Sequence, residues 1–265
     1  MKDFWSETGK IKRLLDKRSG LILFLDFDGT LSPITSVPQN AIIYSDVLEI
    51  LKKLVVIPNC RVIIVSGRSL LDVKRKVGIK SVDYCGNHGL EWEIDGRHFT
   101  APVKLETEKI ENVKKIIFAL AQKFPETVFE DKGLTFALHY RALDSKRVER
   151  LRKVFEIEME YYINTFLISV IYGKMVFDIK PRVRWDKGDF CSYYLKNALT
   201  TVERKRILTI FLGDDKTDED AFAKLVDAIT IKVGYRSNSR AKYFLRSQHE
   251  TKGLLQWFLN CLMIG

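Results

Sequence analysis

The stretch LILFLDFDGT, residues 21–30, places five apolar residues directly before two aspartates that are separated by one phenylalanine. A short apolar run that ends at a glycine-containing turn predicts a buried strand. Asp26 and Asp28 would then stand where the chain leaves that strand. In open parallel sheets this carboxyl end is the edge at which ligands bind. Two carboxylates so close together need a counter-ion, which a bound metal would supply.

Strand-length and helix-length segments alternate on both sides of a central insertion. We expect strands at 21–27, 61–67, 206–215 and 228–233, and helices at 45–55, 70–77, 188–198, 219–225 and the C-terminus. Between residues 102 and 181 the pattern changes to a helix (104–123), two strands separated by residues 130–133, a helix (144–160) and two strands around residues 172–174. This predicts an α/β core with a parallel sheet, residues 1–101 and 182–265, and an inserted α+β cap, residues 102–181.

Composition limits the classes of function. The net charge of +10 comes from 44 Lys and Arg scattered among 34 Asp and Glu, and the only dense basic run is residues 204–206. We therefore expect no nucleic-acid binding; the excess charge indicates a solvated surface or an anionic small substrate. The four cysteines lie far apart without a Cys-x-x-Cys pair, which is typical of reduced thiols in the cytoplasm.

Neither end of the chain predicts a membrane protein. The N-terminus lacks the apolar segment of a signal peptide, and no apolar run approaches the roughly 20 residues that span a bilayer. The apolar C-terminal stretch GLLQWFLNCLMIG favours a helix that covers the sheet; a membrane-lying helix is the alternative. We expect a cytoplasmic monomer.

Three further polar clusters follow the predicted strands or begin a helix. SGRS at residues 66–69 offers a hydroxyl and amides to a phosphate, with a plain strand-to-helix turn as the alternative. GDDKTDED at 213–220 holds five acids, more than a capping box uses, and suits a cation such as Mg2+. Lys187 begins a helix, where it is either a surface lysine or a fixed cation that balances a phosphate.

The motifs DFDGT, SGR, the lysine of WDKG and GDDKTDED occur in the order of the four motifs of haloacid-dehalogenase-type phosphatases, with the cap placed as in the larger-cap branch. The segments LFLDFDGTLSPI, GNHGLEW, EDKGLTFALHYR and GDDKTDEDAF more narrowly resemble those of trehalose-6-phosphate phosphatases. The resemblance covers about residues 20 to 235. It implies a Rossmann-like haloacid dehalogenase core with an inserted cap and a Mg2+-dependent phosphatase of trehalose biosynthesis that hydrolyses trehalose 6-phosphate.

The resemblance also implies roles for the core residues. Asp26 would be the nucleophile that forms an aspartyl-phosphate, and Asp28 the general acid and base. Lys187 would hold the transferring phosphoryl group. The remaining predicted core residues are the phosphate-binding Ser66 and Gly67, the metal-binding Asp26, Asp28 (through its carbonyl), Asp214 and Asp218 (from the second coordination sphere), and the substrate-binding Arg68, Asn87 and His88. His88 in the GNHG turn is equally well explained as a structural histidine near the hinge.

In the cap the resemblance implies contacts with sugar hydroxyls. The residues are Glu130, Lys132, His139, Arg141, Lys174 and Asp178. The alternative is an exposed, salt-bridged sheet. Asp178 stands where the family has a glutamate, so its carboxylate is one methylene shorter.

Three alternatives to a trehalose-6-phosphate phosphatase remain open. They are a phosphatase for another glycosyl phosphate, a sugar phosphotransferase or mutase on the same core, and a catalytically silent sensor. A silent relative is expected to have lost a motif acid, and none is missing. Pathway logic adds a trehalose-6-phosphate synthase as a functional partner.

Overall fold

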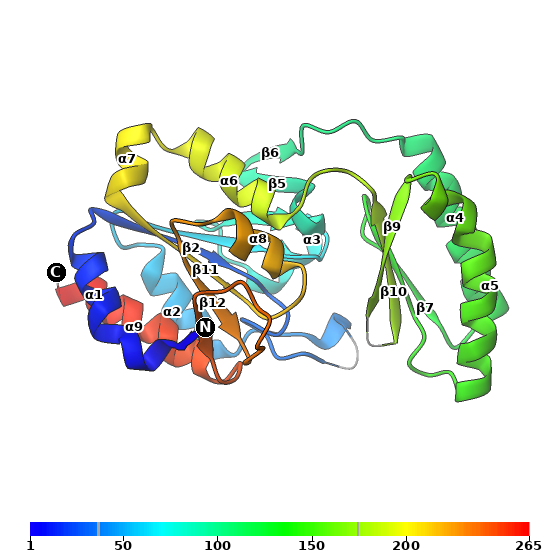
Figure 1. The fold of residues 1–265 in the computed structure, drawn as a ribbon, viewed down its shortest axis with the longest axis horizontal. Helices are drawn as coiled ribbons and strands as arrows, with labels where there is room; N and C mark the ends of the chain where they lie inside the picture. The colour runs from blue at the N-terminus through cyan, green and yellow to red at the C-terminus, as the bar shows by residue number, and fades with distance from the viewer. Residues whose placement is uncertain (36–37, 174, 265) are drawn as a thin grey trace. The chain divides into compact units, whose positions relative to one another are not determined.

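The computed structural model describes residues 1–35, 38–173 and 175–264. The chain forms two compact units, residues 1–101 with 185–265 and residues 102–184. Figure 1 shows the elements of each unit along the chain. The first unit contains the core sheet, and the second contains a separate four-stranded sheet. Each has its own cluster of buried hydrophobic residues.

The core sheet has nine strands in the order β1-β13-β12-β11-β2-β3-β4-β5-β6. Their bounds are β1 Lys2–Asp3, β2 Gly20–Leu25, β3 Cys60–Val65, β4 Asp83–Gly86, β5 Glu91–Ile94, β6 Arg97–Thr100, β11 Ile207–Gly213, β12 Ile229–Val233 and β13 Tyr243–Leu245. All pairs from β1 to β4 are parallel, while β4–β5 and β5–β6 are antiparallel. The purely parallel sheet expected from the sequence is thus extended by an antiparallel hairpin at one edge.

Helices cover both faces of the core sheet, and the side chains of β2 show why. Leu21, Leu23 and Leu25 join the buried cluster with residues of the helices on one face, while Phe24 points to the other face and packs on Phe190 and Tyr194. The core helices are α1 Thr8–Asp16, α2 Ser45–Leu54, α3 Leu70–Val77, α6 Lys187–Ala198, α7 Thr201–Arg206, α8 Asp218–Lys224 and α9 Glu250–Ile264. This alternation buries both faces of β2.

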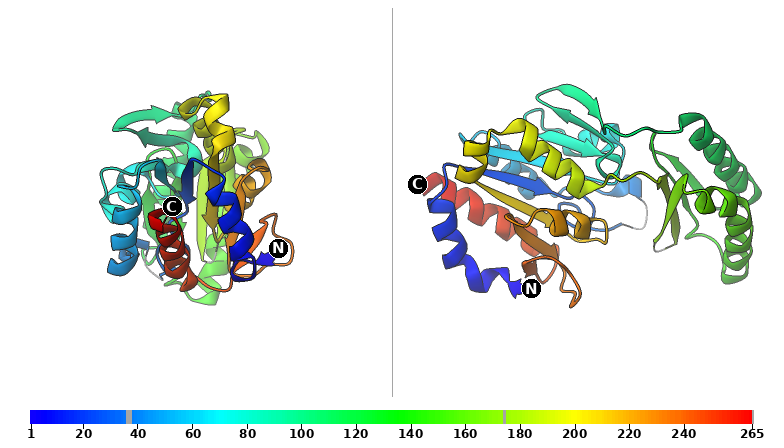
Figure 2. Two further views of the ribbon diagram at one scale, coloured as in Figure 1. Left: turned by 90° about the vertical axis from the view of Figure 1, so that its left-hand side faces the viewer. Right: turned by 45° about the horizontal axis from the view of Figure 1, so that its top comes forward.

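The C-terminal helix belongs to the core. α1 and α9 lie side by side on the same face of the sheet (Figures 1 and 2). Leu254, Leu255, Phe258 and Leu259 of α9 are buried in the core cluster. The expected sheet-covering helix is therefore confirmed. None of the helices in the described part of the chain combines the length and the apolar character of a membrane-spanning segment.

The second unit is an antiparallel sheet in the order β7-β8-β10-β9 with two helices. The elements are α4 Thr107–Lys123, β7 Val128–Asp131, β8 Phe136–His139, α5 Ser145–Asn164, β9 Ile168–Gly173 and β10 Val176–Pro181. Phe177 of β10 stacks on Phe155 of α5 with ring centroids 3.9 Å apart. Residues 130–133 were expected between two strands, but Glu130 and Asp131 pair with β8 and belong to β7.

Candidate active site

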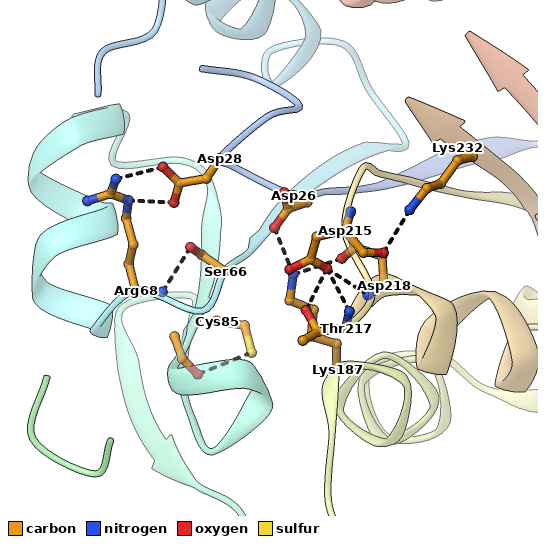
Figure 3. Close-up of polar contacts among 11 residues, drawn as sticks. Asp26, Asp28, Ser66, Arg68, Cys85, Lys187, Asp215, Thr217, Asp218 and Lys232 are labelled. Atoms are coloured by element: carbon orange, nitrogen blue, oxygen red, sulfur yellow. Dashed lines mark hydrogen bonds and ion pairs between the residues drawn. The ribbon is translucent and has the colours of Figure 1, made fainter. Parts of the chain in front are cut away.

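Asp26 lies at the carboxyl end of β2 and is 4% exposed. Its backbone N–H donates to the carbonyl of Leu212 at 2.9 Å, which fixes it against the end of β11. Lys187, the first residue of α6, extends its ammonium between two carboxylates, 2.8 Å from Asp26 Oδ1 and 2.7 Å from Asp218 Oδ1 (Figure 3). Lys187 is only 2% exposed, so the surface-lysine interpretation is wrong. The fold thus joins β2, α6 and α8 through one buried charged group.

The acidic turn after β11 is held by its own hydrogen bonds. Asp215 Oδ1 accepts from the N–H and the hydroxyl of Thr217 and from the N–H of Asp218. Asp218 Oδ2 in return accepts from the N–H of Asp215 at 3.0 Å. Lys232 of β12, which is fully buried, donates to the Asp215 carbonyl at 2.7 Å. Sequence reasoning counted Asp215 only as one of the five acids of this turn and gave no role to Lys232; a lysine inside the apolar strand AITIKV was the available signal.

The cluster carries an excess of negative charge. Five carboxyls, those of Asp26, Asp214, Asp215, Asp218 and Glu219, face two lysines, Lys187 and Lys232, which leaves a formal charge of −3 when all are ionised. Burial raises the pKa of Asp26 to about 8; Lys187 opposes this rise, and Asp214 and Asp215 add to it. Burial and the charge of Asp218 likewise raise the pKa of Asp214 to about 7.

Two other buried groups, Lys187 and Asp215, stay ionised because of their neighbours. Burial works against the ammonium, but Asp218 and Asp26 hold the pKa of Lys187 above its usual range. Burial also opposes ionisation of Asp215, yet Lys187 and the hydrogen bond from Thr217 hold its pKa below the usual range.

These residues fit a hard divalent cation. Oxygen atoms of Asp26, Asp214 and Asp218 lie within 4.8 Å of one another. Asp214 Oδ1 is buried and has no hydrogen-bond partner among the described residues. A Cβ on Gly29 would lie 2.1 Å from Asp214 Oδ2, so only glycine leaves room for this carboxylate. An all-oxygen donor set is the one preferred by Mg2+ and Ca2+, and a divalent charge offsets most of the negative charge of the cluster.

Asp28 faces away from Asp26 and toward α3 (Figure 3). Arg68 binds it through two hydrogen bonds, Nε to Oδ2 at 2.7 Å and Nη2 to Oδ1 at 2.6 Å. The same guanidinium reaches Asp72 at 2.8 Å. Ser66 Oγ, which is buried, accepts from the N–H of Arg68 at 3.1 Å. The structure therefore places Arg68 as a partner of Asp28, a contact that its predicted role as a substrate ligand did not include.

The GNHG turn packs against the loop that contains Ser66. Asn87 and His88 are both buried with positive φ, and the N–H of His88 donates to the Ser66 carbonyl at 3.1 Å. The side-chain amide of Asn87 donates to Glu91 at 2.6 Å. A Cβ on Gly67 would lie 2.4 Å from the imidazole of His88. These contacts support a structural role for the turn, and substrate contact by Asn87 or His88 stays a prediction.

In the second unit, four of the predicted cap residues pair on the sheet. Lys132 Nζ lies 3.0 Å from Asp178 Oδ1, and His139 Nε2 lies 2.9 Å from Glu130 Oε2. Glu130 and Asp178 are both opposite Ala137 in register, so they share one face of the sheet. Arg141 follows β8 and is exposed, and Lys174 lies outside the described residues. One face of the sheet therefore carries two pairs of polar side chains.

The family model described as trehalose-phosphatase matches residues 24–249, which include every core motif above.

The chain belongs to the trehalose-phosphatase family.

Curated relatives agree with this membership. The chain is 31% identical over 219 residues to trehalose-phosphate phosphatase B of Arabidopsis thaliana, covering 79% of this chain and 57% of that protein. It is 34% identical over 204 residues to trehalose-phosphate phosphatase of Mycobacterium tuberculosis, covering 76% of this chain and 50% of that protein. The matched part of this trehalose-phosphatase family member thus spans about half the length of these relatives.

Solved structures show the same fold. The C-terminal domain of C. albicans trehalose-6-phosphate phosphatase superimposes with a TM-score of 0.81 at 20% identity, covering 96% of both chains. A trehalose-6-phosphate phosphatase related protein gives a TM-score of 0.72 at 25% identity, covering 90% of this chain and 97% of that one. The predicted family and the α/β core with a separate α+β unit are confirmed.

Proposed function

We propose that this member of the trehalose-phosphatase family is a Mg2+-dependent phosphatase that hydrolyses trehalose 6-phosphate to trehalose and inorganic phosphate. One observation carries the proposal: Asp26 ends β2 inside a buried group of carboxylates that is closed by the ammonium of Lys187. A carboxylate in this setting is a candidate nucleophile for phosphorus, because a fixed cation and a water-poor surrounding accompany it.

In the first step a carboxylate oxygen of Asp26 attacks the phosphorus. The aspartyl-phosphate bond forms as the bond from phosphorus to the sugar oxygen breaks. Lys187, which already contacts Asp26 Oδ1 at 2.8 Å, offsets the repulsion between this carboxylate and the phosphate dianion. Ser66 and the backbone of Gly67 are proposed to donate hydrogen bonds to the phosphoryl oxygens. Burial of Asp26 keeps bulk water from the attacking oxygen.

Asp28 is proposed to move the protons. It protonates the leaving sugar oxygen in the first step and accepts a proton from the water that hydrolyses the aspartyl-phosphate in the second. Both of its carboxylate oxygens accept hydrogen bonds from Arg68 in this structure. Each oxygen keeps a second lone pair that can carry the transferred proton, so Arg68 can set the orientation of Asp28 while the carboxyl group acts.

The carboxylates of Asp26 and Asp214 and the backbone carbonyl of Asp28 would hold Mg2+, with Asp218 orienting the group through its bond to Lys187. The ion, when bound, supplies positive charge against the charge of the phosphoryl oxygens. The unpartnered, buried Asp214 Oδ1 is the observation that supports this assignment.

The polar face of the second sheet is proposed to recognise the sugar. Glu130, Lys132, His139 and Asp178 carry donors and acceptors that match the hydroxyls of a glycoside. Arg141 and Lys174 are proposed as further sugar-binding residues, because the segments around them resemble those of trehalose-6-phosphate phosphatases. Lys132 and Asp178 already pair at 3.0 Å, so sugar hydroxyls would exchange with or join an existing ion pair.

The test is release of inorganic phosphate from trehalose 6-phosphate and a panel of monosaccharide phosphates, with Mg2+ and after chelation. Asp26→Asn removes the nucleophile, and Asp16→Asn on the exposed end of α1 is the matched control. We expect release from trehalose 6-phosphate well above the other sugars, lost with chelation and in Asp26→Asn but retained in Asp16→Asn.

Other outcomes distinguish the alternatives. Metal-dependent release that prefers another sugar phosphate would keep the roles of the core and overturn the proposed role of the second sheet. Transfer of the phosphoryl group to a second sugar without phosphate release would indicate a phosphotransferase. Equal phosphate release by Asp26→Asn and by the native chain would overturn the assignment of Asp26 as the nucleophile.

A further inference from the structure

A second concave site lies at the amino ends of the core strands, whereas Asp26 lies at their carboxyl ends. It has a volume of about 770 Å³ and includes Ile207 and Leu208, the first residues of β11. Asp214 follows the other end of the same strand, so the length of β11 separates this groove from the acidic cluster. Ligand sites for small molecules typically have volumes of about 300–1,000 Å³. The groove is therefore large enough for a metabolite and is distinct from the candidate active site.

The walls of the groove are basic. Arg18, Arg204, Lys205 and Lys224 line it, against one acid, Asp227, while its apolar part includes Leu225. Arg18 donates to the backbone carbonyl of Lys205, and Arg204 to the hydroxyl of Thr201 at 3.2 Å. Within the described ranges, no carboxylate forms an ion pair with Arg18, Arg204 or Lys205. Three cations thus line one concave surface, and none of the three is paired with a carboxylate in the described part of the chain.

The fourth cation connects the groove to the first turn of α6. Lys224 Nζ lies 2.6 Å from Asp186 Oδ2 and 2.7 Å from Asp189 Oδ2. Asp186 caps α6, because its Oδ1 accepts from the N–H groups of Gly188 and Asp189. The next residue is Lys187, whose ammonium closes the acidic cluster. A ligand that draws Lys224 toward the groove would remove one support of this cap.

We propose that the groove binds a small multivalent anion and that binding loosens the first turn of α6 through Lys224. Arg18, Arg204 and Lys205 supply the charge that attracts the anion, and the apolar part of the groove contacts its carbon skeleton. When the anion accepts hydrogen bonds from Lys224, the pairs with Asp186 and Asp189 break. Asp186 then holds the amides of Gly188 and Asp189 less firmly.

Binding is tested by calorimetric titration of the metal-free protein with citrate, a trianion near neutral pH, at low ionic strength. Arg204→Gln/Lys205→Gln removes two exposed groove cations, and Lys146→Gln/Arg150→Gln on the exposed side of α5 removes the same charge elsewhere. We expect one citrate to bind, with affinity weakened at least about tenfold in the groove variant and unchanged in the control. If the native chain does not bind citrate, or if the groove variant binds it equally well, the proposed anion site is wrong.

The connection to α6 is tested by amide hydrogen exchange, which needs no turnover. With citrate bound, the amides of residues 188–190 should exchange between about twofold and thirtyfold faster, the range expected when a helix cap is weakened. The groove variant should show no such change, while the α5 control should behave as the native chain. Citrate binding that leaves exchange at residues 188–190 unaltered would overturn the connection.

Discussion

At the scale of single residues, the site depends most on Lys187. Its ammonium is almost fully buried and contacts Asp26 and Asp218, which come from different segments of the chain. A buried charge is tolerated only when it is paired, so both carboxylates need the ammonium of Lys187. The residue that is proposed to hold the phosphoryl group also keeps two like charges together.

Lys187→Met is therefore expected to destabilise the metal-free protein. It leaves two carboxylates buried without their cation, and breaking a buried ion pair costs about 3–5 kcal/mol. Urea unfolding checks the value. Lys52→Met on the exposed surface of α2 is the control and should change the free energy of unfolding by less than about 0.5 kcal/mol. A Lys187 variant as stable as the control would contradict the assigned burial.

Arg68→Lys tests the orientation of Asp28. Lysine keeps the positive charge but cannot make the two parallel hydrogen bonds that Arg68 makes with this carboxylate. If the proposed function holds, the turnover number should fall by up to about 100-fold because the proton donor is misplaced, with little change in KM. Arg75→Lys, at an exposed position of α3, should leave the turnover number unchanged. A rise in KM at constant turnover would instead support the substrate-binding role first predicted for Arg68.

At the scale of secondary structure elements, register decides which side chains meet. Leu25 of β2 is opposite Ile64 of β3 and Leu212 of β11, so the residues that follow these strands gather at one edge. In the second sheet, the register of Ala137 with both Glu130 and Asp178 places the two acids on one face. Neither grouping depends on nearness in sequence.

Phe177→Ala should weaken the second unit selectively. Phe177 is fully buried and stacks on Phe155, and truncation of a buried phenylalanine costs about 3–5 kcal/mol. Hydrogen exchange should accelerate in β8, β10 and α5, whereas amides of β2 and β11 keep their protection. Phe166→Ala, at a side chain that is 64% exposed, is the control. Equal acceleration in both units would contradict the independence of their cores.

The sequence predicted the longer apolar strands and several helices of the core, but it did not predict α1, α7, β1, β4, β5, β6 or β13. The strand LILFLDF and the helix 70–77 are confirmed within two residues, because apolar runs and caps mark them. β6 was missed since all four of its residues are exposed, although the Asp95-Gly96 turn, with two positive φ angles, was a hairpin signal. The pairing of Arg68 with Asp28 could not be predicted, because it depends on where two loops meet in space.

At the scale of the whole molecule, the buried acids make stability depend on pH. The pKa of Asp26 is raised to about 8 and that of Asp214 to about 7 by burial, relative to unfolded values near 3.8. At pH values between about 4 and 8, Asp26 and Asp214 hold protons in the folded state that they have lost in the unfolded state. The free energy of unfolding must then decrease as the pH rises.

The metal-free protein is accordingly expected to be more stable near pH 5 than near pH 8. Each proton of difference contributes a slope of about 1.4 kcal/mol per pH unit. Asp26→Asn should flatten the decline over this interval, while Asp16→Asn on the surface should leave it as it is. Urea unfolding at a series of pH values measures the slope. Stability that is constant or rises from pH 5 to 8 would contradict the raised pKa values.

The pairing of β2 with β11 also sets an order for folding. Leu21 is opposite Leu208, and the entire second unit lies between them in the chain. Strand pairs so distant in sequence form slowly, because a long loop must close first. The second unit is made from one continuous segment with its own core, so during synthesis it can fold before β11 has left the ribosome. The central pair of the core sheet, and with it the acidic cluster, can therefore form only after the second unit has been synthesised.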